Sequence, residues 1–163
     1  MLEGGTKRDY IRHHMRVQEA TPLWGGLVRN IVRGSEEPEV CNPAMLIAMV
    51  RAGLPVSELD ALQKTLDVPI DKLAPKLGMS KATLHRRKLA GRLEPDESDR
   101  VVRFARLMGK AVEVFESEDS ARAWMSSPQF GLGGETPLDY ATTELGAREV
   151  QNLIGRIDQS VYS

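Results

Sequence analysis

The side chains best suited to chemistry in this 163-residue chain are cations gathered in one stretch, residues 70–93. Seven Lys or Arg residues lie there beside a single acid, Asp71, although the whole chain has a net charge of −1. Lysine and arginine bind phosphate through their charge, and an arginine can also donate two hydrogen bonds to the edge of a guanine. The chemistry that this stretch predicts is recognition of nucleic acid.

Residues 111–163 have the opposite charge, with nine acids and three arginines. A basic block followed by an acidic block favours two surfaces that bind two kinds of partner. Solvated helix faces produce the same pattern, so charge alone leaves both interpretations open.

A helix-turn-helix is the element expected to position the cations. Between residues 73 and 84, the small Ala74 stands where two helices would cross. Gly78 follows four residues later, where the turn favours a positive φ that glycine adopts without strain. The apolar residues that would hold the two helices together are Leu73, Leu77, Met79 and Leu84. This geometry leaves the outer face of the second helix free to enter a major groove.

The candidate DNA-binding residues lie on or beside that outer face. They are Lys81, Thr83, His85, Arg86 and Arg87. We expect Arg86 to contact a guanine and Lys81 to contact the groove or a phosphate, while Lys88 and Arg92 suit phosphates. Arg87 also suits a phosphate, but it stands at a position that is usually apolar, so a structural salt bridge is the alternative for it.

The remaining pattern is helical throughout and predicts an all-α protein. Helices are expected over about residues 23–32, 43–50, 58–66, 71–77, 81–90 and 95–115, then over 117–126, from 137 and from 146. Ser57 and Asp60 are expected to form the capping box of the third of these. Pro75 requires its helix to begin no earlier than about Asp71, with the ring in the first turn. The glycine-rich segment 129–134 is expected to be a loop.

Three units are expected along the chain. Residues 1–41 would be a loosely ordered arm, 42–95 a helix-turn-helix domain and 96–163 a small helical domain. An apolar stripe gives the last unit a core: Val150, Leu153, Ile154, Ile157 and Val161. Trp124 fits that core as its anchor, or a partner as an exposed contact.

Several function classes find no support in the sequence. Cys41 is the only cysteine, so no internal disulfide is possible and a reducing cytoplasm is the expected location. No apolar stretch is long enough to span a membrane. His13, His14 and His85 are not spaced as metal ligands, and no nucleophile motif is present. We therefore expect no enzyme, no metal and no cofactor.

Two blocks of the sequence resemble the Xre/MbcA/ParS antitoxins. The first comprises residues 77–87 and 91–100, LGMSKATLHRR and GRLEPDESDR, and the second comprises 123–128, 131–138 and 143–157. The resemblance extends over about residues 45–163. It implies an antitoxin encoded beside a RES-domain toxin that degrades NAD, with the antitoxin's C-terminal segment covering the toxin's NAD pocket. It also implies repression of its own promoter, and we expect a homodimer within a hetero-oligomeric complex.

Together with this resemblance, the C-terminal unit supplies candidate toxin-binding residues. They are Trp124, Arg148, Arg156, Asp158, Tyr162 and Ser163. Residues 158–163 would present negative and aromatic groups where NAD places its phosphates and base, although a frayed terminus is the ordinary alternative. Gly155 inside the last helix costs about 1 kcal/mol relative to Ala, which close approach of another backbone or a hinge would explain.

Two other functions stay open at this point. The first is a stand-alone helix-turn-helix transcription regulator whose C-terminal domain dimerises or senses a ligand. The second is a small helical enzyme, which the empty search for catalytic motifs disfavours. A toxin gene beside this one would separate the antitoxin from the stand-alone regulator.

Overall fold

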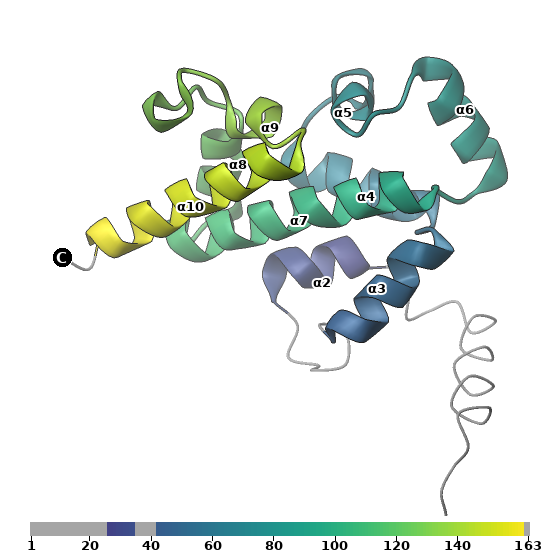
Figure 1. Cartoon of the computed structure of the whole chain (residues 1–163), viewed down its shortest axis with the longest axis horizontal. Coiled ribbons are helices and arrows are strands. Elements are labelled where there is room, and N and C mark those ends of the chain that lie inside the picture. Colours follow the sequence, from purple (N-terminus) through teal and green to yellow (C-terminus); the bar gives the residue numbers. More distant parts are fainter. Residues whose placement is uncertain (1–25, 35–41, 162–163) are drawn as a thin grey trace, which may run out of the picture.

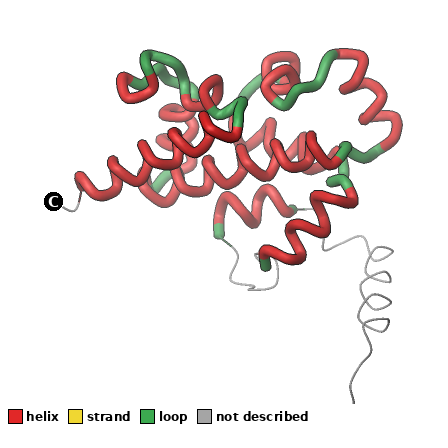
Figure 2. Tube along the Cα trace, in the orientation of Figure 1, coloured by secondary structure: helices red, strands yellow, loops and turns green. Residues whose placement is uncertain are grey.

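The computed structural model describes residues 26–34 and 42–161. Within these ranges the chain forms helices and no strands (Figure 1, Figure 2), and the extended pairing is a single isolated bridge between Pro55 and Arg92. The helices are α2 (Leu27–Arg33), α3 (Pro43–Ala52), α4 (Val56–Leu66), α5 (Ile70–Lys76), α6 (Lys81–Ala90), α7 (Pro95–Phe115), α8 (Glu118–Met125), α9 (Pro137–Tyr140) and α10 (Glu144–Val161), with a 3-10 helix η1 (Phe130–Leu132). The prediction of an all-α protein is confirmed.

The longest helix among the described residues, α7, forms the centre of the molecule. Helices α2, α3 and α4 pack against it from the N-terminal side of the sequence, and α8 and α10 pack against it from the C-terminal side. Figure 1 shows α10 running alongside α7. Along α7, Val101, Ala105 and Met108 stand at helical spacing and are fully buried, and Val112 and Phe115, which continue the same face, are half-buried. This face of the helix therefore enters the core.

Glu97 links the start of α7 to α6. Its carboxylate accepts hydrogen bonds from the Glu94 N–H (2.9 Å) and from Arg87 Nε (2.8 Å). Burial raises the pKa of the Glu97 carboxyl, but the hydrogen bonds from Arg87 and Glu94 outweigh burial and hold this pKa below its ordinary value. The carboxylate is thus charged at neutral pH and holds the cation of α6 against α7.

Glu58 has a role at the start of α2 that the sequence did not predict. Helix α4 follows Pro55 directly, and no side chain caps it, so the capping box expected from Ser57 and Asp60 does not form. Glu58 is instead buried, and its carboxylate accepts hydrogen bonds from three successive N–H groups, those of residues 26, 27 and 28, at 2.8–3.2 Å. A carboxylate at this position satisfies the donors at the start of a helix and favours its dipole.

Helix α2, whose start Glu58 caps, is part of the core. Its residues Leu27, Val28 and Val32 are buried. A Cβ added to Gly109 of α7 would lie 2.8 Å from the Ile31 carbonyl oxygen, so the two helices touch at their backbones. The helix expected at 23–32 lies at 27–33, and these residues are packed, unlike the loosely ordered arm expected there. Residues 1–25 and 35–41, with His13, His14 and Cys41, lie outside the described part of the chain.

Local capping signals placed most of the other helix boundaries correctly. The side chains of Asn42, Ser80, Ser117 and Thr136 each accept a backbone N–H hydrogen bond at the start of their helix. Three details differ from the sequence-based expectation. Pro75 lies in the last turn of α5 rather than the first, α10 begins at Glu144 rather than Gly146, and the 129–134 loop contains η1.

The buried apolar side chains form one continuous cluster that extends from Leu27 to Ile154. Polar contacts also cross between the two halves of the chain. Arg122 Nε of α8 donates to the Thr65 carbonyl of α4 (3.0 Å), and Lys76 of α5 pairs with Asp139 of α9. The expected boundary at residues 95 and 96 coincides with the start of α7, a helix that both halves share. In the described residues, no helix has the length and apolar character needed to cross a membrane.

Replacing Glu58 with Ala should destabilise the protein by about 3 kcal/mol, because it leaves buried N–H groups without an acceptor at the start of α2. Asp60→Ala, an exposed change on the same helix, is the matched control and should stay within about 0.5 kcal/mol of the wild type. Urea unfolding followed by circular dichroism measures both. Equal stabilities for the two variants would contradict the capping role.

Arg87→Ala should also destabilise the protein, by about 1–3 kcal/mol at neutral pH, because Glu97 loses its cation. The lowered pKa of Glu97 means that the contribution of this pair is present above the ordinary carboxyl pKa. It is lost as the pH falls through the folded-state value. Unfolding curves from pH 7 down to pH 3 should therefore show the difference between wild type and variant shrinking. A difference that is constant with pH would contradict the ion pair as its source.

Candidate functional site

The predicted helix-turn-helix is present, formed by α5 and α6. Leu73, Leu77 and Met79 are buried between the helices, and Leu84 is half-buried. Gly78 has a φ of 75°, and a Cβ added there would lie 2.6 Å from an Arg100 guanidinium nitrogen. That guanidinium, which belongs to α7, donates to the Leu77 carbonyl (3.0 Å), so α7 fixes the position of the turn. Both the backbone conformation and the close contact explain why glycine stands at this position.

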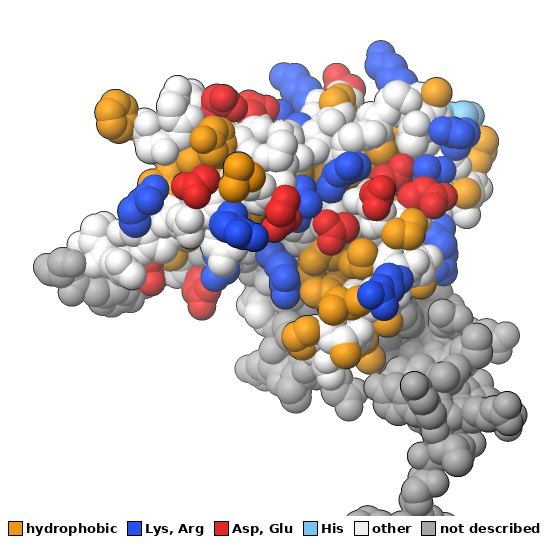
Figure 3. Space-filling model, in the orientation of Figure 1, with side chains coloured by type: hydrophobic (Ala, Val, Ile, Leu, Met, Phe, Trp, Pro, Cys, Tyr) orange, Lys and Arg blue, Asp and Glu red, His pale blue; other side chains and the backbone are white. Residues whose placement is uncertain are grey.

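Helix α6 stands out from the body of the protein, because none of its residues is buried. Two of its residues contact the rest of the protein: Leu84 packs against the core, and Arg87 pairs with Glu97 of α7. Figure 3 shows Lys and Arg side chains at the end of the molecule where α6 lies. The exposed residues of this helix are Lys81, Ala82, His85, Arg86, Lys88, Leu89 and Ala90. A helix that is supported from one side and carries cations on the other has the form needed to enter a groove.

The candidate DNA-binding residues divide into two groups on this helix. Lys81, His85 and Arg86 are exposed on its outer side. Thr83 belongs to the helix cap, since its N–H donates to Ser80 Oγ (3.1 Å), and its hydroxyl accepts from Arg86 Nη2 (3.3 Å).

Arg87 points toward α7 instead. Besides its hydrogen bond to Glu97, Arg87 Nη1 lies 3.8 Å from Glu94 Oε1, and its side chain is only 18% exposed. Of the two roles considered for Arg87, these contacts are those of the structural salt bridge. Arg92 is also engaged, donating to the carbonyls of Ala52 and Gly53 at the end of α3.

The candidate toxin-binding residues are spread over two helices. Trp124 of α8 is half-buried and packs its ring against Phe115, with ring centroids 5.5 Å apart. Arg148, Arg156 and Asp158 are all exposed on α10. Two turns of helix separate the two arginines, about 12 Å at 1.5 Å per residue, so they are not brought together. Tyr162 and Ser163 lie outside the described residues.

Gly155 shows no close contact that would account for it. A Cβ added there would meet nothing within 4 Å. Close approach of a backbone from the described part of this chain is therefore not the reason for a glycine in the last helix. Beside it, Arg156 and Asp158 line a shallow cleft together with Lys110 and Glu113 of α7.

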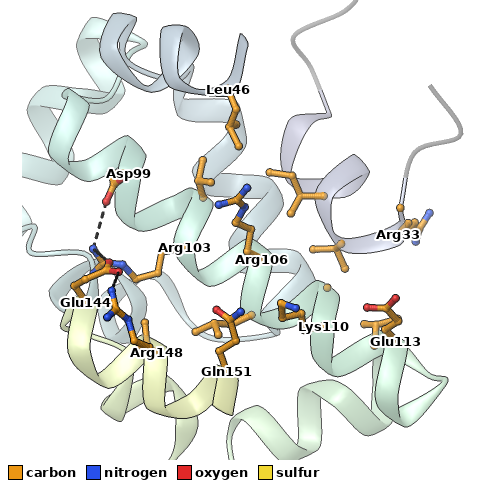
Figure 4. Close-up of a pocket in the computed structure, with 18 residues that line it drawn as sticks. Arg33, Leu46, Asp99, Arg103, Arg106, Lys110, Glu113, Glu144, Arg148 and Gln151 are labelled. Carbon is orange, nitrogen blue, oxygen red and sulfur yellow. Dashed lines mark hydrogen bonds and ion pairs between the residues drawn. The ribbon is translucent and has the colours of Figure 1, made fainter. Parts of the chain in front are cut away.

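An open groove that the sequence did not predict lies between α2, α3, α7 and α10 (Figure 4). Its apolar lining includes Val32 and Leu46. Its charged residues are Arg33, Asp99, Arg103, Arg106, Lys110, Glu113, Glu144 and Arg148. Arg103 lies between the carboxylates of Asp99 (3.3 Å) and Glu144 (3.2 Å), and Arg148 lies 3.9 Å from Glu144. Four helices from distant parts of the sequence form this groove, so no local sequence motif predicts it.

The described residues do not offer a metal centre. Within residues 26–34 and 42–161, no three His, Cys, Asp or Glu side chains gather closely enough to hold an ion.

Comparison with known proteins shows a family match for α6 and for the C-terminal helices. Residues 45–106 match the model of the antitoxin Xre-like helix-turn-helix domain, and residues 110–159 match that of the antitoxin Xre/MbcA/ParS C-terminal toxin-binding domain. The first match includes α6 and its exposed cations. The second includes α8, the 129–134 loop and most of α10.

Three curated relatives are each named antitoxin Xre. The protein from Photorhabdus laumondii is 38% identical over 147 residues, which cover 89% of this chain and 93% of the relative. The protein from Yersinia enterocolitica is 36% identical over 121 residues, 73% of this chain and 82% of the relative. The protein from Pseudomonas putida is 35% identical over 65 residues, 40% of this chain and 41% of the relative. With both domain models matched in order along one helical core, this chain belongs to the Xre family of antitoxins.

Proposed function

We propose that this protein neutralises a RES-domain, NAD-degrading toxin by covering the toxin's active site with the end of α10, and that it represses its own operon through α6. The observation that carries the proposal is the exposed end of α10 within the region matched to a toxin-binding domain. In this role the protein is a binding partner rather than an enzyme, as the names of its relatives suggest.

The exposed end of α10 supports the toxin-binding role. Residues 155, 156 and 158–160 are exposed, and Figure 1 shows this end of α10 as the C-terminal extremity of the helical body. The Asp158 carboxylate is available to occupy a site that binds a phosphate of NAD. We propose that Tyr162 and Ser163, which follow the described helix, extend this contact.

The exposed outer side of α6 supports the DNA-binding role. Lys81 and Arg86 stand there with no acidic partner among the described residues, so their charges are available for DNA. An arginine in a major groove commonly makes two hydrogen bonds to guanine, and lysines bind phosphates. We also propose a homodimer within a hetero-oligomeric complex with the toxin, because two such helices would read the two halves of a symmetric operator.

Replacing Arg86 with Ala should weaken binding to the upstream promoter about tenfold or more, since a bidentate base contact is worth about 1–3 kcal/mol. Adding Lys81→Ala should weaken it further and reduce the salt dependence of binding. Arg106→Ala, at an exposed arginine of α7, is the matched control and should bind DNA as the wild type does. Gel-shift titration at two salt concentrations measures these effects. Unchanged affinity in the Lys81/Arg86 double variant would remove α6 from the DNA surface.

Deleting residues 158–163 should restore NAD cleavage by the toxin while leaving part of the complex intact. The reason is that the deletion removes the proposed cover of the active site but keeps α8, α9 and most of α10. NAD consumption by the toxin encoded in the adjacent gene, measured with wild-type or truncated antitoxin, gives the answer, and a pull-down reports the remaining binding. Complete suppression of NAD cleavage by the truncated chain would refute occlusion by the tail.

A further inference from the structure

Phe130 is held in solvent with no part of its side chain covered. Its relative exposure is 103%, whereas Phe104 is fully buried and Phe115 is half-buried. It lies in η1, in the loop that follows α8. Figure 1 shows this loop at the outer edge of the molecule, and Figure 3 shows hydrophobic side chains at that edge. Because its apolar surface stays in water, an aromatic ring exposed to this degree contributes no hydrophobic stabilisation to the folded protein.

The loop that carries Phe130 is closed by its own hydrogen bonds. The Gln129 N–H donates to the Glu135 carbonyl (3.0 Å), and the Gly134 N–H donates to the Gln129 carbonyl (2.9 Å), which ties the two ends together. The Gly133 N–H donates to the carbonyl of Phe130 itself (3.1 Å). The Gln129 side-chain amide also donates to the carbonyls of residues 124 and 127 at the end of α8. These bonds fix the backbone on both sides of the ring.

The residues next to Phe130 are held against the protein. Leu132, two positions further on, is buried at 3% exposure. A Cβ added to Gly131 would lie 3.1 Å from a methyl carbon of Leu153, so the loop backbone rests directly on α10. Gly133 and Gly134 have φ values of 67° and 87°, which let the chain turn back after Leu132. The loop therefore buries one apolar side chain and presents the other outward from a fixed base.

We propose that Phe130 is an anchor that inserts into an apolar pocket of the toxin and docks this antitoxin independently of the α10 tail. Large aromatic side chains that fill a partner's pocket dominate many protein interfaces, and a base that is already ordered lowers the entropy lost on binding. The proposal rests on the proposed function, since it names a further contact with the same toxin.

The surroundings of Phe130 indicate that its partner is the toxin, and they indicate what kind of pocket would receive it. The loop lies within residues 110–159, the region matched to the toxin-binding domain, and it rests on α10, the helix that also carries the tail. Of the three acids between residues 123 and 147, Asp139 is paired with Lys76 and Glu144 with Arg103, which leaves Glu135 at the end of the loop. The complementary surface is an apolar pocket with a Lys or Arg at its rim that can meet Glu135.

The test is Phe130→Ala in the full-length chain, measured against the purified toxin encoded by the adjacent gene. Surface plasmon resonance should show binding at least about 30-fold weaker than that of the wild type, mainly through faster dissociation. Phe130→Leu should restore part of the affinity. Ile47→Ala, at an exposed apolar residue of α3 outside the matched toxin-binding region, should bind as the wild type does. Thermal unfolding and promoter binding should not change, because the Phe130 ring supports no other residue.

The outcomes separate this proposal from the proposed function. At saturating concentration, Phe130→Ala should still suppress NAD cleavage, because its α10 tail is intact. Toxin binding by Phe130→Ala equal to that of the wild type would overturn the anchor and leave the proposed function standing. Unchanged toxin binding with a changed mass in light scattering would also overturn it, since Phe130 would then contact a second copy. A wild-type chain that does not bind this toxin would overturn both proposals.

Discussion

Helix α7 is packed on several sides, and its burial sets where the other helices can lie. This 21-residue helix places Val101, Phe104 and Met108 in a core to which both halves of the chain contribute. Helices α2 and α4 cover it from one half, and α8 and α10 cover it from the other. The helix-turn-helix and the toxin-binding region that the family models distinguish are therefore built on one shared element.

Polar groups inside this framework fix how the helices meet. The Glu58 carboxylate holds the start of α2, Glu97 holds Arg87 of α6, and Arg100 holds the turn between α5 and α6. Each of these groups would cost free energy if buried without a partner, and each has one. Their charges are used within the protein, which separates them from the charges available to partners.

The side chains proposed to bind DNA and the toxin are exposed on the surface of the folded protein. Lys81 and Arg86 stand on a helix with no buried residue, Asp158 lies at the exposed end of α10, and Phe130 projects from a closed loop. The basic and acidic blocks of the sequence end up on different elements, α6 and the region from α8 to α10. One compact core thus presents two surfaces of different chemistry, suited to a nucleic acid and to a protein.

The helical class, the helix-turn-helix and most helix boundaries could be predicted from the sequence, because they follow from signals within a few residues of one another. Ser80 as an N-cap and Gly78 at a positive φ are examples. The side chains that bond within the protein could not be predicted in this way, because their partners are distant in the sequence. Glu58 contacts a backbone about 30 residues away, and Arg87 meets an acid ten residues away on another helix. The tertiary structure also decided that Phe130 faces solvent while Leu132 is buried. Local patterns identify an apolar residue, but the direction it faces depends on which distant helix the loop packs against.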